Sequence, residues 1–274
     1  MLTKDIIEAF AGQMTPKFLA TADREGKPNV VPVISLMAPD PETLVFGEFM
    51  VWKTRRNLLE NPRVTALVLT ESLETWTVRG DFVDFRETGP FVDLLNESPM
   101  FRYNAYLGIR RAGVIKVRDV TAHEKLSKAG LMADMVRVGM ARAFSTEKPD
   151  GEKGEKRGAA MPRQVEEKFS RVQAVRVFSW VDRKDGYPDA VPVMSMRPAG
   201  KKTLLFAGGP FGKKLETIEP GAPAAASVIT FDPVAYQVKG TWGGFRRPAG
   251  LSVGRMDVTE VYSASPPRPG ERIA

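Results

Sequence analysis

The sequence contains no cysteine and a single histidine, His123, among 274 residues. Without cysteine the chain cannot form disulfides, use a thiolate nucleophile or build a cysteine-ligated zinc or iron–sulfur site. One histidine is too few for a usual zinc site, and no nucleophile motif accompanies it to suggest a catalytic triad. We therefore interpret His123 as an exposed surface residue. Redox or transfer chemistry would need a bound cofactor.

Long hydrophobic runs are also missing, since none approaches the roughly 20 residues that cross a bilayer. The first residues mix Lys4 with Asp5 and predict a helix rather than a signal peptide. We therefore expect a cytoplasmic protein without membrane association. The net charge of +7 is dispersed along the chain. Its densest basic run, 153–157, lies in a low-complexity segment, so we favour a solvated basic surface over nucleic-acid binding.

An internal repeat dominates the chain. Residues 26–80 match residues 186–240 without a gap, at a constant offset of 186 − 26 = 160. A match that keeps one register over this length indicates a duplicated unit. Identical pairs include Gly26/Gly186, Pro32/Pro192, Ser35/Ser195, Phe46/Phe206, Lys53/Lys213 and Gly80/Gly240.

The copies differ beyond this match. Asp119 pairs with Asp257 at an offset of 138, so the first copy holds 160 − 138 = 22 additional residues. These fall around 88–112, where Phe91, Leu94 and Leu95 predict a short helix.

Between the copies, residues 124–144 carry apolar side chains at three- and four-residue spacing, which predicts an amphipathic helix. The Lys-, Glu- and Gly-rich stretch 145–160 is predicted to be a mobile linker. We expect a first domain over 1–123, the helix and linker over 124–165, and a second domain over 166–274.

Each copy is predicted to be mainly β, with about six strands and one clear helix. Tight turns between short strands favour a small antiparallel barrel. Pro32 and Pro192 indicate an edge strand or a bulge, while Gly80 and Gly240 indicate bulges or close backbone approach. In the first copy we expect strands at 18–23, 30–36, 43–47, 64–70, 75–85 and 114–120, and a helix at 54–60 that Pro62 ends.

The candidate binding site lies where a strand joins that helix. A helix N-terminus offers N–H groups and a positive dipole end to a phosphate, and Lys53 adds a full charge there. The Thr54 hydroxyl can cap the helix or donate to the anion. A lysine before a helix is usually only solvated, but Lys213 and Lys214 recur at these positions in the second copy. The recurrence favours a ligand.

A second recurring basic position, Arg79 and Lys239, fits function and an outward-facing strand residue equally well. The matching aromatics Trp76 and Tyr236 leave the same two alternatives. The glycine-rich run 208–214 is not a phosphate-binding P-loop, because its spacing is too short and a lysine stands where a hydroxyl should bind magnesium.

Two segments together resemble a known family. They are Asp23-x-x-Gly26-x-Pro28-Asn29-Val30-Val31-Pro32-Val33 and Lys53-Thr54-x-x-Asn57-Leu58-x-x-Asn61-Pro62-Arg63-Val64. This pattern is similar to the pyridoxamine 5′-phosphate oxidase-like family of FMN-binding split barrels. Its members are usually homodimers with FMN at the interface between barrels. The resemblance implies two split β-barrels in one chain, packed as an intrachain pseudo-dimer.

The resemblance also implies which residues bind the cofactor. Phosphate contacts correspond to Lys53, Thr54 and Asn57. In the second copy, Lys213 and Lys214 correspond to the phosphate side, but Lys214 replaces the threonine, so a single FMN per chain fits the sequence. Ribityl and ring contacts correspond to Pro32, Val33, Ile34, Ser35, Gly47, Glu48 and Phe49.

Three functions remain open on this basis. The first is an FMN-dependent oxidoreductase or flavin reductase that uses NADH, NADPH or a redox partner protein. The second is a non-catalytic flavin carrier, and the third is a binder of a deazaflavin or haem on the same fold. Oxidation of pyridoxamine phosphate would need a second phosphate pocket, which the sequence does not identify. No catalytic residue and no metal ligand is assigned.

Overall fold

The computed structural model describes residues 1–49, 51–99, 108–144, 160–232, 234–265 and 269–274. Contacts divide the chain into two units, each described here by itself. The first comprises Met1–Lys125 and Arg183–Ala190, and the second comprises Leu126–Asp182 and Val191–Ala274. The predicted linker lies outside the described residues except for Ala160, and the domain limits at 123 and 165 stay predictions.

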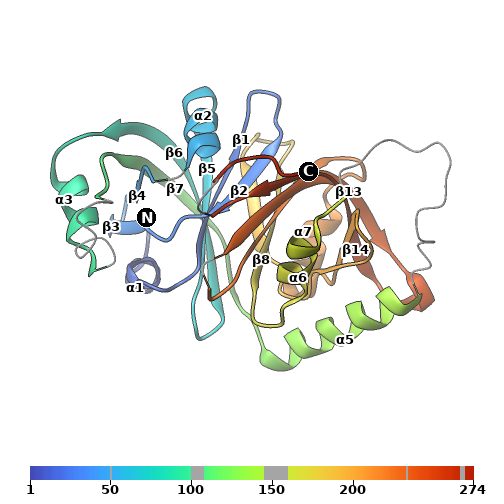
Figure 1. Cartoon of the computed structure of the whole chain (residues 1–274). Coiled ribbons are helices and arrows are strands. Elements are labelled where there is room, and N and C mark those ends of the chain that lie inside the picture. Colours follow the sequence, from blue (N-terminus) through green and yellow to red (C-terminus); the bar gives the residue numbers. More distant parts are fainter. Residues whose placement is uncertain (50, 100–107, 145–159, 233, 266–268) are drawn as a thin grey trace. The chain divides into compact units, whose positions relative to one another are not determined.

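The first unit contains one antiparallel seven-stranded sheet in the order β2-β1-β5-β6-β7-β4-β3 (Figure 1). Three described helices accompany it: α1 (Lys4–Ala11), α2 (Trp52–Glu60) and α3 (Pro90–Glu97). The strands are β1 (Lys17–Ala22), β2 (Pro28–Pro32), β3 (Met37–Asp40), β4 (Thr43–Gly47), β5 (Arg63–Leu69), β6 (Glu74–Arg86) and β7 (Ala112–Lys125).

The second sheet has the order β10-β11-β14-β13-β12-β8-β9, which repeats the first strand for strand when read from the other edge. The described helices here are α5 (Lys128–Phe144), α6 (Arg163–Ser170) and α7 (Gly212–Glu216), with short 3-10 turns at Gly209–Phe211 and Pro248–Gly250. The strands are β8 (Val175–Val181), β9 (Pro188–Pro192), β10 (Arg197–Pro198), β11 (Thr203–Phe206), β12 (Pro223–Ile229), β13 (Ala235–Arg246) and β14 (Val253–Ser263). The predicted mainly β fold and its duplication are confirmed.

Each sheet has one strand more than the six expected, and the predicted strand 30–36 is shorter than expected. It ends at Pro32, and the chain then turns, with the Leu36 N–H donating to the Val33 carbonyl at 3.1 Å. The short strand β3 follows. Proline at the end of β2 removes a ladder donor, and β2 lies at the sheet edge where this is tolerated. Pro192 ends the edge strand β9 in the same way.

The paired glycines mark a bulge in both copies, as predicted. The register shifts between Arg79 and Gly80 in one sheet and between Lys239 and Gly240 in the other. A Cβ at Gly80 would lie 2.7 Å from the Lys116 carbonyl oxygen, and one at Gly240 would overlap the corresponding oxygen of Asp257. Close backbone approach therefore requires glycine here. Lys116 and Asp257 face Thr43 and Thr203 in the two sheets, so the expected pairing of Asp257 with Asp119 is wrong, and the first copy holds 160 − 141 = 19 additional residues rather than 22.

The repeat extends further upstream than the sequence match. The buried Lys17 ammonium donates to the carbonyls of Phe10 and Gly12, at 3.0 and 2.9 Å, and so anchors the end of α1. The buried guanidinium of Arg176 donates to the Phe169 carbonyl at 2.9 Å and anchors α6 in the same way. The offset is 176 − 17 = 159 because the β8–β9 turn has one residue more than the β1–β2 turn.

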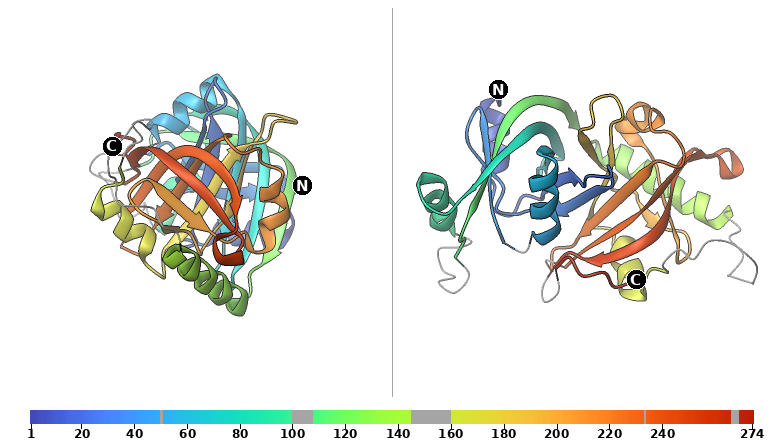
Figure 2. Two further views of the ribbon diagram at one scale, coloured as in Figure 1. Left: turned by 90° about the vertical axis from the view of Figure 1, so that its right-hand side faces the viewer. Right: turned by 90° about the horizontal axis from the view of Figure 1, so that it is seen from above.

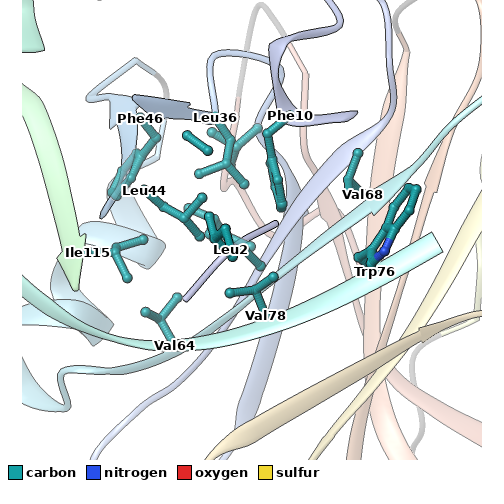
Figure 3. Packing of buried hydrophobic residues seen from close by; sticks show 14 of the residues in the cluster. Leu2, Phe10, Leu36, Leu44, Phe46, Val64, Val68, Trp76, Val78 and Ile115 are labelled. Carbon is teal, nitrogen blue, oxygen red and sulfur yellow. The ribbon is translucent and has the colours of Figure 1, made fainter. Parts of the chain in front are cut away.

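The core of the first unit fills the space between its sheet and α1 (Figure 3). Leu2 and Phe10 from the N-terminal segment meet Leu44 and Phe46 of β4, and Val64, Val78 and Ile115 close the cluster. All are less than a tenth exposed. Burial of these large apolar side chains is the main force that holds the unit together.

A different helix covers the corresponding outer strands in each copy. In the first copy, Val92 and Leu95 of α3 pack against Val45 of β4 and Val114 of β7. In the second, Val138 and Ala141 of α5 pack against Leu205 of β11 and Val253 of β14. The ribbon of α5, drawn in green, lies beside the strands of this sheet in Figure 2. The first covering helix comes from the predicted insertion, and the second from the segment between the copies.

Candidate functional site

The candidate site lies at the N-terminal end of α2, directly after β4. Val51 precedes the helix and forms no side-chain cap, and the first turn contains no acidic residue. The half-buried Lys53 occupies this turn instead. The positive end of a helix dipole favours an anion, and Lys53 adds a positive charge at the same place. The residues present therefore fit a phosphate group.

Thr54 and Asn57 belong to a buried polar cluster under the same helix. The Asn57 side-chain amide donates to the Thr21 hydroxyl at 3.1 Å, and the Asn29 amide donates to Thr54 Oγ1 at 3.3 Å and to Thr21 Oγ1 at 3.4 Å. Both predicted residues are 2% exposed or less. The cluster fixes α2 on β1 and β2, and their direct contact with a phosphate stays a prediction.

Thr21 and Asn29 are members of this cluster that the sequence analysis did not single out as site residues. Asn29 Oδ1 is buried and accepts no hydrogen bond from the part of the chain that the structure describes. Asn29 does occur in the family-like segment between Pro28 and Val30, which is the signal that could have found it.

The predicted ring-binding residues lie on two segments that the fold joins. The Gly47 N–H, at the end of β4, donates to the Ser35 hydroxyl at 3.0 Å. Val33 and Ser35 are buried, whereas Pro32 and Ile34 are half-buried. The turn after β2 thus lies beside the end of β4, from which the chain continues into α2.

Glu48 and Phe49 complete the predicted set. Both are half-buried. The Glu48 carboxylate binds Arg55 at 2.7 Å and Arg111 at 3.5 Å, and Arg111 also binds Glu87. Glu48 therefore orients two cations beside the start of α2.

The second copy does not reproduce this arrangement. Its helix α7 has only five residues, Lys213 is exposed, and the Lys214 ammonium lies 5.7 Å from the centre of the Trp180 ring. Thr217, at the position of Asn57, is exposed and donates to the Lys214 carbonyl at 2.8 Å. The buried amide cluster of the first copy therefore has no counterpart at these positions.

The recurring Arg79 takes part in an ionic network of the first unit. It binds Asp185 at 2.6 Å and Asp189 at 3.3 Å. The Tyr187 hydroxyl donates to Asp81 at 2.5 Å; burial first, and then this bond, raises the pKa of Tyr187 to about 12. Burial opposes the shift of Asp81, but bonds from Tyr187 and Arg118 lower the pKa of that carboxyl overall. Sequence spacing could not reveal these contacts, since residues 183–190 come from the second copy.

His123 is exposed, as predicted, and its ring stacks on Trp76 with 4.8 Å between centroids. Within the described ranges, no group of three or more histidine or acidic side chains could hold a metal ion. None of the helices described is long and apolar enough to span a membrane.

The chain is a duplicated, mainly β protein whose first copy has a helix start that favours an anion. Comparison with known proteins identifies its family. Residues 3–180, more than half of the chain, match the family described as pyridoxamine 5'-phosphate oxidase. The chain belongs to this family, and the resemblance inferred from the sequence is confirmed. Among curated proteins, none matches the chain significantly.

Three similar solved structures each cover less than half of this chain. HupZ of Group A Streptococcus is 19% identical, with a TM-score of 0.38, over 46% of this chain and 100% of that one. An FMN-binding protein from Syntrophomonas wolfei is 17% identical, with a TM-score of 0.38, over 46% and 90%. An F420 reductase is 26% identical, with a TM-score of 0.34, over 46% and 100%.

Proposed function

We propose that this chain binds FMN in its first copy and acts as a flavin-dependent oxidoreductase or flavin reductase. The observation that carries the proposal is the first turn of α2, which combines Lys53 with the positive helix end and lacks both an acidic residue and a side-chain cap. In a member of this family, this feature would provide a binding site for the phosphate of FMN.

The proposed roles follow from the geometry of the first unit. Lys53 and the first-turn N–H groups of α2 hold the phosphate, while Thr54 and Asn57 keep the helix start in place through Asn29 and Thr21. The turn 32–35 and residues 47–49 lie along the remainder of the cofactor, with Ser35 and Gly47 joined by their hydrogen bond. Bound FMN would supply hydride or electron transfer, and the protein residues bind and orient it.

We propose one FMN per chain rather than two. The second copy has Lys214 and Thr217 at the positions of Thr54 and Asn57, and the short helix α7 offers a single turn. Lys213 and Lys214 provide positive charge at this position, but the second copy lacks, at these positions, the buried polar cluster that holds α2 in the first.

The test begins with the absorbance spectrum of purified protein, followed by titration with FMN. We expect flavin absorbance or saturable uptake at close to one FMN per chain. Protein that takes up no FMN but binds a deazaflavin or haem would contradict the cofactor assignment. Rapid reduction of the bound flavin by NADH or NADPH supports a reductase, whereas reduction only by a protein donor supports a carrier.

A further inference from the structure

Helix α5 carries apolar residues on two opposite faces. Val138 and Ala141 are buried against the second sheet. On the other side Met132, Val136, Met140 and Phe144 are exposed by 63, 59, 47 and 58%. Most of the apolar residues whose spacing predicted this helix therefore lie on its exposed side. A helix at the surface of a folded unit usually presents polar residues there.

The outward side contains no charge over a wide arc. At about 100° per residue, eight consecutive positions of the helical wheel cover roughly 140° and carry neither charged nor hydrogen-bonding side chains. The charged residues Lys128, Asp134, Arg137 and Arg142 lie outside this arc. We call these eight residues the outer face of α5: Ala129, Met132, Ala133, Val136, Gly139, Met140, Ala143 and Phe144.

The pattern of residues on the outer face is nearly symmetric about Val136. Three residues to either side stand Ala133 and Gly139, and four residues to either side stand Met132 and Met140. Seven residues away, Ala129 matches Ala143. A two-fold axis through an antiparallel pair of identical helices places such positions of the two copies at the same height, on opposite sides of the axis. We propose that the outer face of α5 binds the same face of a second copy of this chain, with the axis at Val136.

The sizes of the side chains suit this pairing. In an antiparallel pair centred on Val136, Met140 lies on the same side as Ala133 of the second copy. Met132 likewise lies beside Gly139 of the second copy. Each long side chain thus meets a small one, which is how ridges of one helix fill the grooves of another.

The small residues also favour a helix over a lipid surface as the partner. The basic residues bordering the outer face would suit an anionic membrane, which binds helices through large apolar side chains. Four of the eight residues are alanine or glycine, however, and offer little area for insertion while allowing two backbones to approach closely. A single helix pair buries less than the roughly 1,600 Å² of a standard interface, so a weak, reversible dimer is expected.

The first experiment measures the mass of the full chain by sedimentation velocity over concentrations that bracket about 100 μM. The wild type shifts from monomer to dimer, and Val136→Asp, which places two carboxylates at the axis, stays monomeric. Val172→Asp is the matched control, because Val172 is 65% exposed in the turn before β8. A wild type that stays monomeric throughout, or a Val172→Asp variant that loses the dimer equally, overturns the proposal.

The second experiment tests the register and uses the absence of cysteine from the chain. Val136→Cys should form a disulfide-linked dimer on oxidation, because residue 136 meets its own copy. In the antiparallel pair, residues 132 of the two copies lie about 12 Å apart along the axis, too far for a disulfide. Met132→Cys should therefore stay uncrosslinked. Equal crosslinking of both variants indicates parallel helices and contradicts the proposed axis.

A third measurement tests whether the outer face binds a lipid surface instead of a second copy. The wild type is sedimented with vesicles of phosphatidylcholine and phosphatidylserine, beside Val136→Asp. No difference between the two proteins is expected. Vesicle binding by a monomeric wild type that Val136→Asp abolishes would assign the outer face to a membrane surface and overturn the dimer.

Discussion

The two copies share a sheet and differ in what surrounds it. Strand order, bulge glycines and the serine bonds are repeated: the Ser35 and Ser195 hydroxyls each accept an N–H at 3.0 Å, from Gly47 and Ala207. The helix after β4 is shortened in the second copy, since α2 has nine residues and α7, which starts at the matching position, has five. Features of the sheet itself are therefore common to both copies, whereas the helix at the candidate site differs between them.

The largest expected effect tests the shared bulge. Gly240→Ala should lower the free energy of unfolding by about 4 kcal/mol, because its Cβ would overlap the Asp257 carbonyl and the backbone must shift. Gly80→Ala should cost about 2 kcal/mol, since the nearest backbone atom is 2.7 Å away. Denaturant unfolding of both variants measures this difference. Equal losses would mean that the two bulges are equally tight.

The buried cations that anchor α1 and α6 provide the next comparison. Arg176→Met should cost about 3 kcal/mol, because the guanidinium serves the carbonyls of Phe169, Ala174 and Met194. Lys17→Met leaves two carbonyls without this donor and should cost about 1.5 kcal/mol. The same unfolding measurement ranks them. A reversed order would show that desolvation of the arginine outweighs its hydrogen bonds.

The asymmetry of the candidate site is tested by cofactor affinity. Lys53→Ala should weaken FMN binding by about 2 kcal/mol, or roughly 30-fold, through loss of a charged phosphate contact. Lys213→Ala, at the matching position of the second copy, should change affinity by less than about twofold. Fluorescence titration with FMN measures both. Comparable losses would indicate that both copies bind, and no loss in either would remove Lys53 from the phosphate site.

The smallest effect concerns pH. Burial lowers the pKa of Lys17 from 10.5 to about 8. Between these values the unfolded chain binds more protons than the folded one, so stability should rise with pH by about 1 kcal/mol per unit from about pH 8 to pH 10. The unfolding free energy of the wild type should show this slope, and Lys17→Met should flatten it. An unchanged slope in the variant would assign it to other groups.

Local rules predicted much of the fold, because the alternation of apolar and polar residues and the positions of glycine and proline are local features of the sequence. β4 matches its predicted bounds, and α2 starts two residues before the helix predicted at Thr54. The turn after Pro32 was missed because residues 33–36 continue the apolar run of β2. The sequence could not predict that Lys17 anchors α1 either, since the side chain of a lysine in a strand normally reaches solvent.

The candidate site was predicted less completely than the fold. Spacing and charge located the segment around Lys53, but hydrogen bonds between residues far apart in sequence decide how α2 is held. Thr21 and Asn57 are 36 residues apart, and Tyr187 binds Asp81 across 106 residues. Similarly, periodicity predicted helix α5 without showing that most of its apolar positions face outward, because both sides of the helix carry apolar residues.

Carrying both sheets on one polypeptide has a genetic consequence. In an assembly of two identical chains, every mutation appears twice, so neither site can change alone. Here a substitution such as the lysine at position 214 alters one copy and leaves Thr54 untouched. The duplicated chain can therefore specialise one half for chemistry while the other half is free to drift.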